Sequence, residues 1–363
     1  MNSITNHFKK LDWILITTSV LISGIGLLSI YSSSHFKGDF LNFKKQIVFF
    51  IISLILMFLF SFLDWRIIRE NSYLILALYF LSILSLVGLF FFAPEIRQVK
   101  SWYKLGPISI DPIEFTKLVL IILFAKYFSR RHAEMYNVKH ILVSSFYLLL
   151  PSFLVFLQPN LGSVLILIFL WVGILIISGI KIRHFLILCL IGILIFVLIW
   201  LFFLKDYQKQ RLVSFFRPKM EPIGIGWSQK QSKIAIGSGG LFGQGLFKGS
   251  QTQYGFLPEP QTDFIFAAIS EELGFIGVIA LLFLFSLLIW RIIQTAFMTQ
   301  SNFQKLFSSG LATILISQIF INIGMNLGLL PIIGVSLPLV SYGGSGLIST
   351  FIAFGILQSI KTH

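Results

Sequence analysis

The chain has 363 residues, of which 56% are hydrophobic and only 12% are charged, and its mean hydropathy is +0.90. Apolar runs of roughly 18 residues or more recur along nearly the whole length, as in proteins with several membrane-spanning helices. This composition excludes a water-soluble domain and predicts an all-α, polytopic integral membrane protein. The single cysteine, Cys189, excludes an intramolecular disulfide, and six scattered histidines without metal-ligand spacing argue against a structural metal site.

The apolar runs divide into about ten predicted spans, with a long polar gap after the seventh. The first run, residues 11–31, is long enough to cross a bilayer and lacks a signal-peptide cleavage pattern, so we expect it to stay in the mature chain. The others cover residues 46–63, 73–92, 115–128, 141–156, 163–177, 182–203, 264–290, 306–327 and 337–360. We expect a single membrane domain over residues 1–363, with a large loop at residues 204–262.

Lysine and arginine are unevenly divided between the two sides of these spans. Short segments on the side of the N-terminus carry about thirteen of them, and those on the opposite side carry about seven. The positive-inside rule therefore predicts that both termini are cytoplasmic and that the loop at 204–262 lies outside.

That loop carries eight basic residues against three acidic ones. Such a surface suits an anionic partner, for example a lipid phosphate or pyrophosphate, although the same charge could merely keep a loop in water. Nucleic acid fits poorly, because the basic residues face away from the cytoplasm. Residues 227–236 could form a short interfacial helix, and the glycines at 237–245 would allow tight turns and close backbone approach. A nucleotide-binding loop is set aside, since no strand precedes these glycines and no GK[ST] ends them.

Charged residues at the edges of spans are costly, so each needs a partner or a task. Glu114 and Lys117 stand three residues apart at the outer end of the fourth span, which predicts an ion pair whose lysine could still donate to a phosphate. Asp263 directly precedes the eighth span, where it could be a first-turn acid that complements the helix dipole or a functional group. Glu272 lies nine residues further, about 13 Å along a helix axis.

Residues 331–346 contain two prolines and several glycines close to the start of the tenth span. Non-helical backbone at membrane depth is tolerated only where it is buried in protein or lines a cavity. We therefore expect a re-entrant segment that walls a cleft on the outer face, next to Asp263.

Three stretches of the chain resemble the SEDS family (shape, elongation, division and sporulation): "QSKIAIGSGGLFGQGL", "GSQTQYGFLPEPQTDFIFAAISEELGFIG" and "GMNLGLLPIIGVSLPLVSYGGSG". The similarity covers nearly the whole chain in the same order, and the "GSQTQ" segment is more like the rod-shape branch than the division branch. The resemblance implies a ten-span peptidoglycan glycosyltransferase of the bacterial cytoplasmic (inner) membrane. Such an enzyme polymerises lipid II at the outer face during cell elongation and shape maintenance, and its partner is a class B penicillin-binding protein that acts as transpeptidase.

Matched motif by motif, the resemblance implies that Asp263 is the catalytic aspartate and that Glu114 and Lys117 are the family's paired charges. The other positions that fall in its motifs are Lys233, Ser238, Gln251, Ser341 and Tyr342. The chain departs from the family pattern in "DPIE" for QPSE, "QPNLGS" for PDLG, "FFRP" for FLDP and "QTDF" for HTDF. Asn160 thus replaces an acid, which leaves open whether a divalent cation (Mg or Mn) takes part; no organic cofactor and no protein-held metal are expected.

The chemistry of such a transfer needs two things. A base must take the proton of the acceptor hydroxyl, and positive charge must hold the departing undecaprenyl pyrophosphate. Asp263 is the candidate base, and Lys117, Arg211 and Lys233 are candidates for the pyrophosphate, with or without a cation. Two alternatives stay open: a lipid II flippase and a non-catalytic scaffold for wall synthesis. The clustering of charge at the outer side and the lack of an internal repeat weigh against a transporter.

Overall fold

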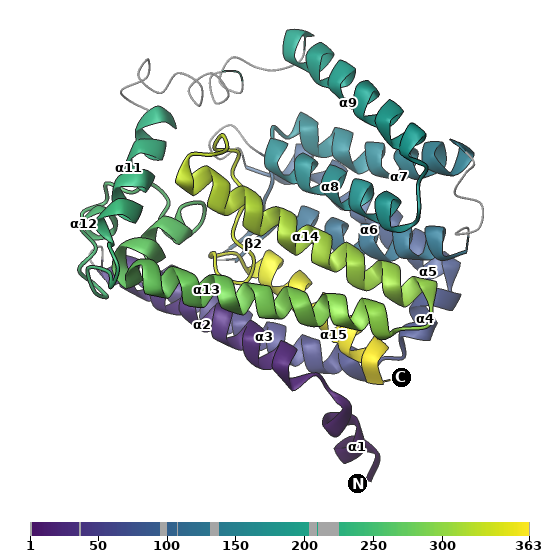
Figure 1. Ribbon diagram of the computed structural model, residues 1–363, viewed down its shortest axis with the longest axis horizontal. Coiled ribbons are helices and arrows are strands. Elements are labelled where there is room, and N and C mark those ends of the chain that lie inside the picture. Colours follow the sequence, from purple (N-terminus) through teal and green to yellow (C-terminus); the bar gives the residue numbers. More distant parts are fainter. Residues whose placement is uncertain are drawn as a thin grey trace.

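The computed structural model describes residues 2–35, 38–94, 100–106, 108–130, 138–202, 209 and 225–362. Within these residues a long helix lies at each of the ten predicted spans (Figure 1). These helices are α2 (Trp13–His35), α3 (Leu41–Phe62), α5 (Ser72–Phe92), α6 (Pro112–Ser129), α7 (Val138–Leu157), α8 (Leu161–Ile177), α9 (Ile182–Phe202), α13 (Ile265–Met298), α14 (Asn302–Leu327) and α15 (Gly344–Thr362). The shorter elements are α1 (Asn2–Lys10), α4 (Trp65–Glu70), α11 (Ile225–Ser238), α12 (Ser250–Gln253) and a hairpin of β1 (Tyr103–Leu105) and β2 (Ile108–Ile110).

Seven of the described helices are long and apolar enough to cross a bilayer: α2, α3, α5, α7, α9, α13 and α14. The other three belong to the same bundle but have weaker signals. Helix α8 is apolar but has only 17 residues, α6 carries three charged side chains, and α15 is rich in Gly, Ser and Thr. The prediction of an all-helical, polytopic membrane protein is confirmed.

The bundle is organised around α13, α14 and α15. Helix α14 packs against α13, α6 and α8, while α13 packs on α2 and α15 packs on α3. The fully buried phenylalanines Phe303 and Phe307 of α14 and Phe351 and Phe354 of α15 mark this centre. Helix α9 has no buried residue and lies along the upper edge of the bundle in Figure 1, as expected of a strongly apolar helix that faces lipid.

Helix α13 is kinked at Gly274, where the backbone adopts φ 67° and ψ −167°. The glycine-rich loop fills the break: the amides of Gln244 and Gly245 donate to the carbonyls of Glu271 and Glu272 (2.9 and 3.0 Å), and the amide of Phe275 donates to the carbonyl of Gly240 (2.9 Å). A methyl group at position 274 would come within 2.2 Å of the nitrogen of Gly243, so a side chain does not fit. The predicted close backbone approach of these glycines is confirmed.

One span begins later than predicted, and one predicted helix is packed on the bundle. The tenth span was placed at 337–360, but residues 328–343 are non-helical and α15 begins at Gly344. The helix expected at 227–236 is present as α11, with one face packed on α13 and α14: Ser232 is fully buried there and its hydroxyl donates to the carbonyl of Asn326 (2.9 Å). The β1–β2 hairpin was not predicted.

Candidate active site

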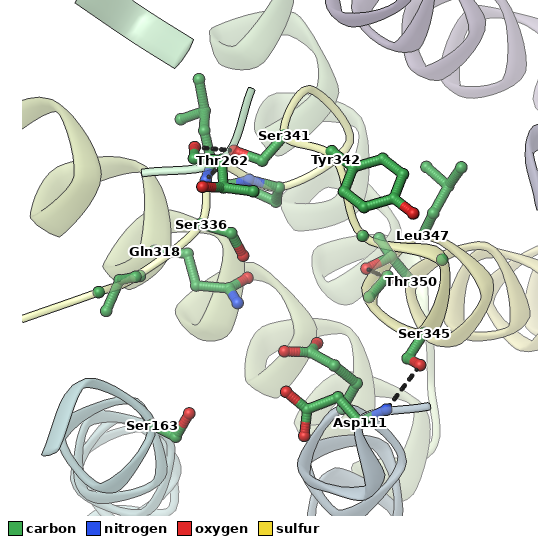
Figure 2. Close-up of a pocket in the computed structure, with 18 of the residues that line it drawn as sticks. Asp111, Ser163, Thr262, Gln318, Ser336, Ser341, Tyr342, Ser345, Leu347 and Thr350 are labelled. Carbon is green, nitrogen blue, oxygen red and sulfur yellow. Dashed lines mark hydrogen bonds between the residues drawn. The ribbon is translucent and has the colours of Figure 1, made fainter. Parts of the chain in front are cut away.

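A polar cavity of about 450 Å³ opens between the start of α6, the segment before α13 and the non-helical segment 328–343. We call it the polar pocket. Figure 2 shows Asp111 at the start of α6, Gln318 of α14, and Ser341 and Tyr342 grouped around this space. The predicted site residues among its lining are Glu114, Lys117, Asp263, Ser341 and Tyr342. Segments far apart in the sequence thus meet at one site, and the predicted cleft beside Asp263 is confirmed.

Two buried asparagines of α14 fix the backbone at Asp263. The side-chain amides of Asn322 and Asn326 both donate to the Asp263 carbonyl, at 3.1 and 3.0 Å, and neither asparagine is exposed. Asn322 also donates to the carbonyl of Val335 (2.8 Å), and so ties Asp263 to the non-helical segment. The preceding carbonyl, that of Thr262, accepts from the Ser341 hydroxyl at 2.8 Å (Figure 2). Asp263 is therefore anchored from two sides by its main chain, which leaves its side chain to line the pocket.

Glu114 and Lys117 form the predicted ion pair. The Lys117 ammonium donates to Glu114 Oε1 at 2.6 Å, and the lysine is only 5% exposed. An ammonium has three donors, and the contact with Glu114 uses one of them. Lys117 can therefore pair with Glu114 and still donate toward the polar pocket that it lines.

Asp111 is a pocket residue that the sequence did not single out, although the "DPIE" departure marks its position. It caps α6 by accepting from the amide of Ile113 (3.2 Å), and its own amide donates to the Ser345 hydroxyl (2.9 Å, Figure 2). Withdrawal from water, together with the nearby Glu114 carboxylate, raises the pKa of Asp111 to about 8. At neutral pH this carboxyl therefore keeps its proton and can donate a hydrogen bond.

Three predicted loop residues do not line the polar pocket. Lys233 and Ser238 are exposed on α11; Lys233 lies against Gly328, where a methyl group would come within 2.0 Å of its Cε. The Ser238 hydroxyl donates to the carbonyl of Ala235 (2.9 Å). Gln251 lies in α12, where its amide donates to Glu271 (2.7 Å). Arg211 lies outside the described residues, so its part in the site stays a prediction.

The two acids of α13 hold the loop in place. Glu271 accepts from the amides of Gln251 and Thr252 (2.7 and 3.0 Å) and from the Thr252 hydroxyl (2.7 Å). Glu272 accepts from the Ser32 hydroxyl and from the side-chain amide of Gln253. Both carboxylates are buried beneath α12, so their positions inside the span are explained by these hydrogen bonds.

In the part of the chain that the structure describes, the pocket's side chains do not form a complete ligand set for a divalent cation, so the participation of Mg or Mn together with substrate phosphates stays a prediction. Among the described residues, no three His, Cys, Asp or Glu side chains come together in a group that could hold a metal ion. The Glu114 carboxylate is paired with the Lys117 ammonium. Asn160 stands where the family pattern has an acid, and it caps α8 by accepting from the amide of Ser163 (3.2 Å).

A protein-family model described as "Cell cycle protein", which groups FtsW, RodA and SpoVE, matches residues 11–363. Stage V sporulation protein E of Bacillus subtilis is 35% identical over 364 residues, which is 97% of each chain. The peptidoglycan glycosyltransferase MrdB of Escherichia coli K12 is 39% identical over 292 residues, 79% of this chain and 77% of MrdB.

Solved structures also resemble this chain over nearly its whole length. A chain of a peptidoglycan synthase complex, described as coordinating polymerization and crosslinking, superposes with a TM-score of 0.83 at 30% identity and 97% coverage of both chains. The rod shape determining protein RodA of Thermus thermophilus superposes with a TM-score of 0.72 at 29% identity, over 97% of this chain and 96% of RodA.

Proposed function

This chain belongs to the SEDS family of peptidoglycan glycosyltransferases, and we propose from that premise that it polymerises lipid II into glycan strands with Asp263 as the general base. The observation that carries this proposal is the polar pocket itself. It brings the Asp263 carboxylate, the Lys117 ammonium and the Ser341–Tyr342 segment to one cavity at the ends of the spans. These are the group types that a glycosyl transfer from a lipid pyrophosphate requires.

In the proposed reaction the 4-hydroxyl of an acceptor sugar attacks the anomeric carbon of the lipid-linked donor. Asp263 takes the hydroxyl proton, the new glycosidic bond forms, and the bond to the pyrophosphate breaks. The leaving group is undecaprenyl pyrophosphate, whose developing charge is stabilised by Lys117. A single displacement inverts the anomeric carbon, so an α-linked donor gives a β-linked strand.

Preorganisation supports this assignment of the base. The hydrogen bonds from Asn322 and Asn326 to the Asp263 carbonyl, and from Ser341 to the Thr262 carbonyl, hold the main chain of this acid in place beside the polar pocket. A base that is fixed before substrate arrives avoids the cost of ordering it during the reaction. Glu114 has a supporting role here, because it orients Lys117 and offsets the cost of its burial.

The cellular role that we propose is elongation and maintenance of cell shape, with a class B penicillin-binding protein as the crosslinking partner. The "GSQTQ" segment favours the elongation role. The similarity to a chain of a polymerising and crosslinking complex favours the partner. The distribution of Lys and Arg favours cytoplasmic termini, so that the polar pocket faces the outside.

The test is polymerisation of labelled lipid II by the purified protein, alone and with its penicillin-binding partner. Removing a general base costs about 10² to 10⁴ in rate, so Asp263→Asn should make almost no polymer while its affinity for lipid II stays near that of the wild type. Asp39→Asn is the matched control, because Asp39 lies between α2 and α3, does not line the polar pocket, and accepts with its Oδ1 from the amide of Leu41 (2.9 Å).

Wild-type activity in Asp263→Asn would reject Asp263 as the base. If the wild type makes no polymer under any partner condition but moves lipid II across liposomes, the enzyme proposal itself fails and the flippase alternative replaces it.

A further inference from the structure

A second cavity, of about 360 Å³, lies at the opposite ends of α6 and α14 from the polar pocket. We call it the basic cavity. It is lined by Arg69, Glu70, Ser129, Arg130, Ser301, Asn302 and Phe303. Glu114 and Arg130 are sixteen residues apart on and just after α6, about 24 Å along a helix axis, so the two cavities are distinct sites on opposite sides of the apolar layer.

A buried lysine without a hydrogen-bond acceptor stands beside this cavity. Lys126 lies one turn before Arg130 on α6 and is 7% exposed, and its Nζ has no hydrogen-bond partner in the part of the chain that the structure describes. Its charge interacts with those of Arg130, Arg69 and Glu70, all of which line the cavity. A buried ammonium with no acceptor is strongly unfavourable, so this arrangement calls for an anion.

The described side chains in and beside the basic cavity carry a net positive charge, even with the negative charge of Glu70 included. Arg69 donates to Glu70 Oε1 (3.2 Å), and its guanidinium is held over the Trp65 ring at 5.0 Å. The Glu70 side chain is 69% exposed and so points largely to solvent. Among the described residues, Arg69 and Arg130 in the lining and Lys126 beside it, against Glu70, leave two net positive charges.

The start of α14 adds to the attraction for an anion. Ser301 and Asn302, which open this helix of 26 residues, line the basic cavity. The amides of a helix N-terminus and its dipole favour negative charge. Lys126, on a different helix, stands beside this cavity without lining it, and its charge is a second, independent attraction for an anion.

We propose that the basic cavity binds a phosphate group, carried either by the headgroup of an acidic lipid or by a free phosphate. Guanidinium groups bind phosphate oxygens in pairs, and the Lys126 ammonium supplies a point charge beside them. Basic cavities between helices at the membrane surface are typical sites for acidic headgroups.

A neighbouring cavity of about 770 Å³ shares Arg69 and Ser301 but is a poorer candidate. Two of its other cations are already paired, because Arg291 and Lys361 both donate to Asp12, at 2.7 and 2.9 Å, and a third, Arg66, is exposed to solvent. The anion is therefore assigned to the basic cavity, where Lys126 has no such partner among the described residues.

The test measures binding to the full-length purified protein in neutral detergent, by native mass spectrometry and by the shift of the thermal midpoint. The probes are inorganic phosphate in one arm, and phosphatidylglycerol against phosphatidylcholine in the other. Lys126→Met removes the buried charge and keeps most of the volume, and Arg130→Gln removes the neighbouring charge. Lys305→Gln is the matched control, since Lys305 is an exposed lysine in the first turn of α14 that does not line the cavity.

We expect Lys126→Met and Arg130→Gln to bind the probe about tenfold more weakly, as the loss of one charge-assisted hydrogen bond predicts, and Lys305→Gln to bind within about twofold of the wild type. Without a probe, Lys126→Met should unfold at the same temperature as the wild type or higher, because it removes an uncompensated buried charge. A response only to phosphatidylglycerol identifies a lipid site, and a response to inorganic phosphate identifies a free-phosphate site. The proposal is overturned if neither probe binds, or if the control weakens binding as much as Lys126→Met does.

Discussion

Asn322 offers the sharpest test of how the base is positioned. Its side-chain amide donates to the carbonyls of Asp263 and Val335, at 3.1 and 2.8 Å, and it is fully buried. Asn322→Leu keeps nearly the same shape and removes both donors. The Asp263 carbonyl would still accept from Asn326 (3.0 Å), so the helix start should remain folded while its register against the Val335 segment loosens.

The two effects of this change differ in size. Three side-chain hydrogen bonds are lost: the two that Asn322 donates and the one that its Oδ1 accepts from Asn326 (3.3 Å). Each is worth about 0.6 kcal/mol within membrane bundles, so we expect a loss of about 2 kcal/mol in the free energy of unfolding. A displacement of about 1 Å at a reacting group costs about 100-fold in rate. The rate of polymerisation should therefore fall by about two orders of magnitude in a protein that is only slightly destabilised.

The assay compares kcat and KM for lipid II with the thermal midpoint of each variant. We expect the loss in kcat, with KM nearly unchanged, because the asparagine contacts backbone and not substrate. Ser317→Ala is the control: the Ser317 hydroxyl donates to the Thr313 carbonyl of the same helix (2.7 Å) and does not line the polar pocket, so kcat should not change. An Asn322→Leu enzyme that is folded and has wild-type kcat would refute the positioning argument.

Two further predictions concern acids at opposite ends of the bundle. Burial alone would raise the pKa of Asp12, but hydrogen bonds from Lys361 and Arg291 outweigh it and hold that pKa below its usual 3.8. The stabilisation by ionised Asp12 is therefore present above about pH 4 and is lost as the pH falls further. Asp12→Asn should lower the free energy of unfolding by roughly 3 kcal/mol at pH 7. The melting temperatures of this variant and of the wild type should converge as the pH is lowered from 7 to 3. The pKa of Asp111 is raised to about 8, so this group lowers stability as the pH rises from about 4 to 8. Asp111→Asn should flatten that part of the melting profile, and an unchanged slope would contradict the raised pKa.

The membrane spans could be predicted from the sequence because the signal is local. A run of apolar residues long enough to cross a bilayer is visible without knowing what it packs against, and even the short α8 and the charged α6 were located in this way. The Glu114–Lys117 pair is equally local, since both residues lie on one face of the same helix. The start of α15 was misplaced because residues 337–340 are apolar, although their backbone is non-helical.

What could not be predicted depends on contacts between distant segments. The Gly274 kink is possible only because the loop at 240–245 supplies donors and acceptors to the opened backbone, and nothing near Gly274 in the sequence indicates this partner. The same holds for Asp111, which becomes a pocket residue because α15 brings Ser345 to its amide. Lys233 carries the charge expected of a phosphate ligand. That charge does not predict its observed position, which is against Gly328 and outside the lining of the polar pocket.

The different positions of Asp263, Glu271 and Glu272 follow from the membrane environment. Non-helical backbone in an apolar surrounding must find its hydrogen bonds within the protein. Glu271 and Glu272 meet this need, because they accept from loop amides and side chains at α12 and so hold the loop on the bundle. Asp263 differs from them in that asparagine side chains hold its main chain while its own side chain lines the cavity. Glu271 and Glu272 thus support the fold through their side-chain oxygens, whereas Asp263 combines a main chain held by asparagines with a side chain at the polar pocket, the arrangement that the proposed role as general base requires.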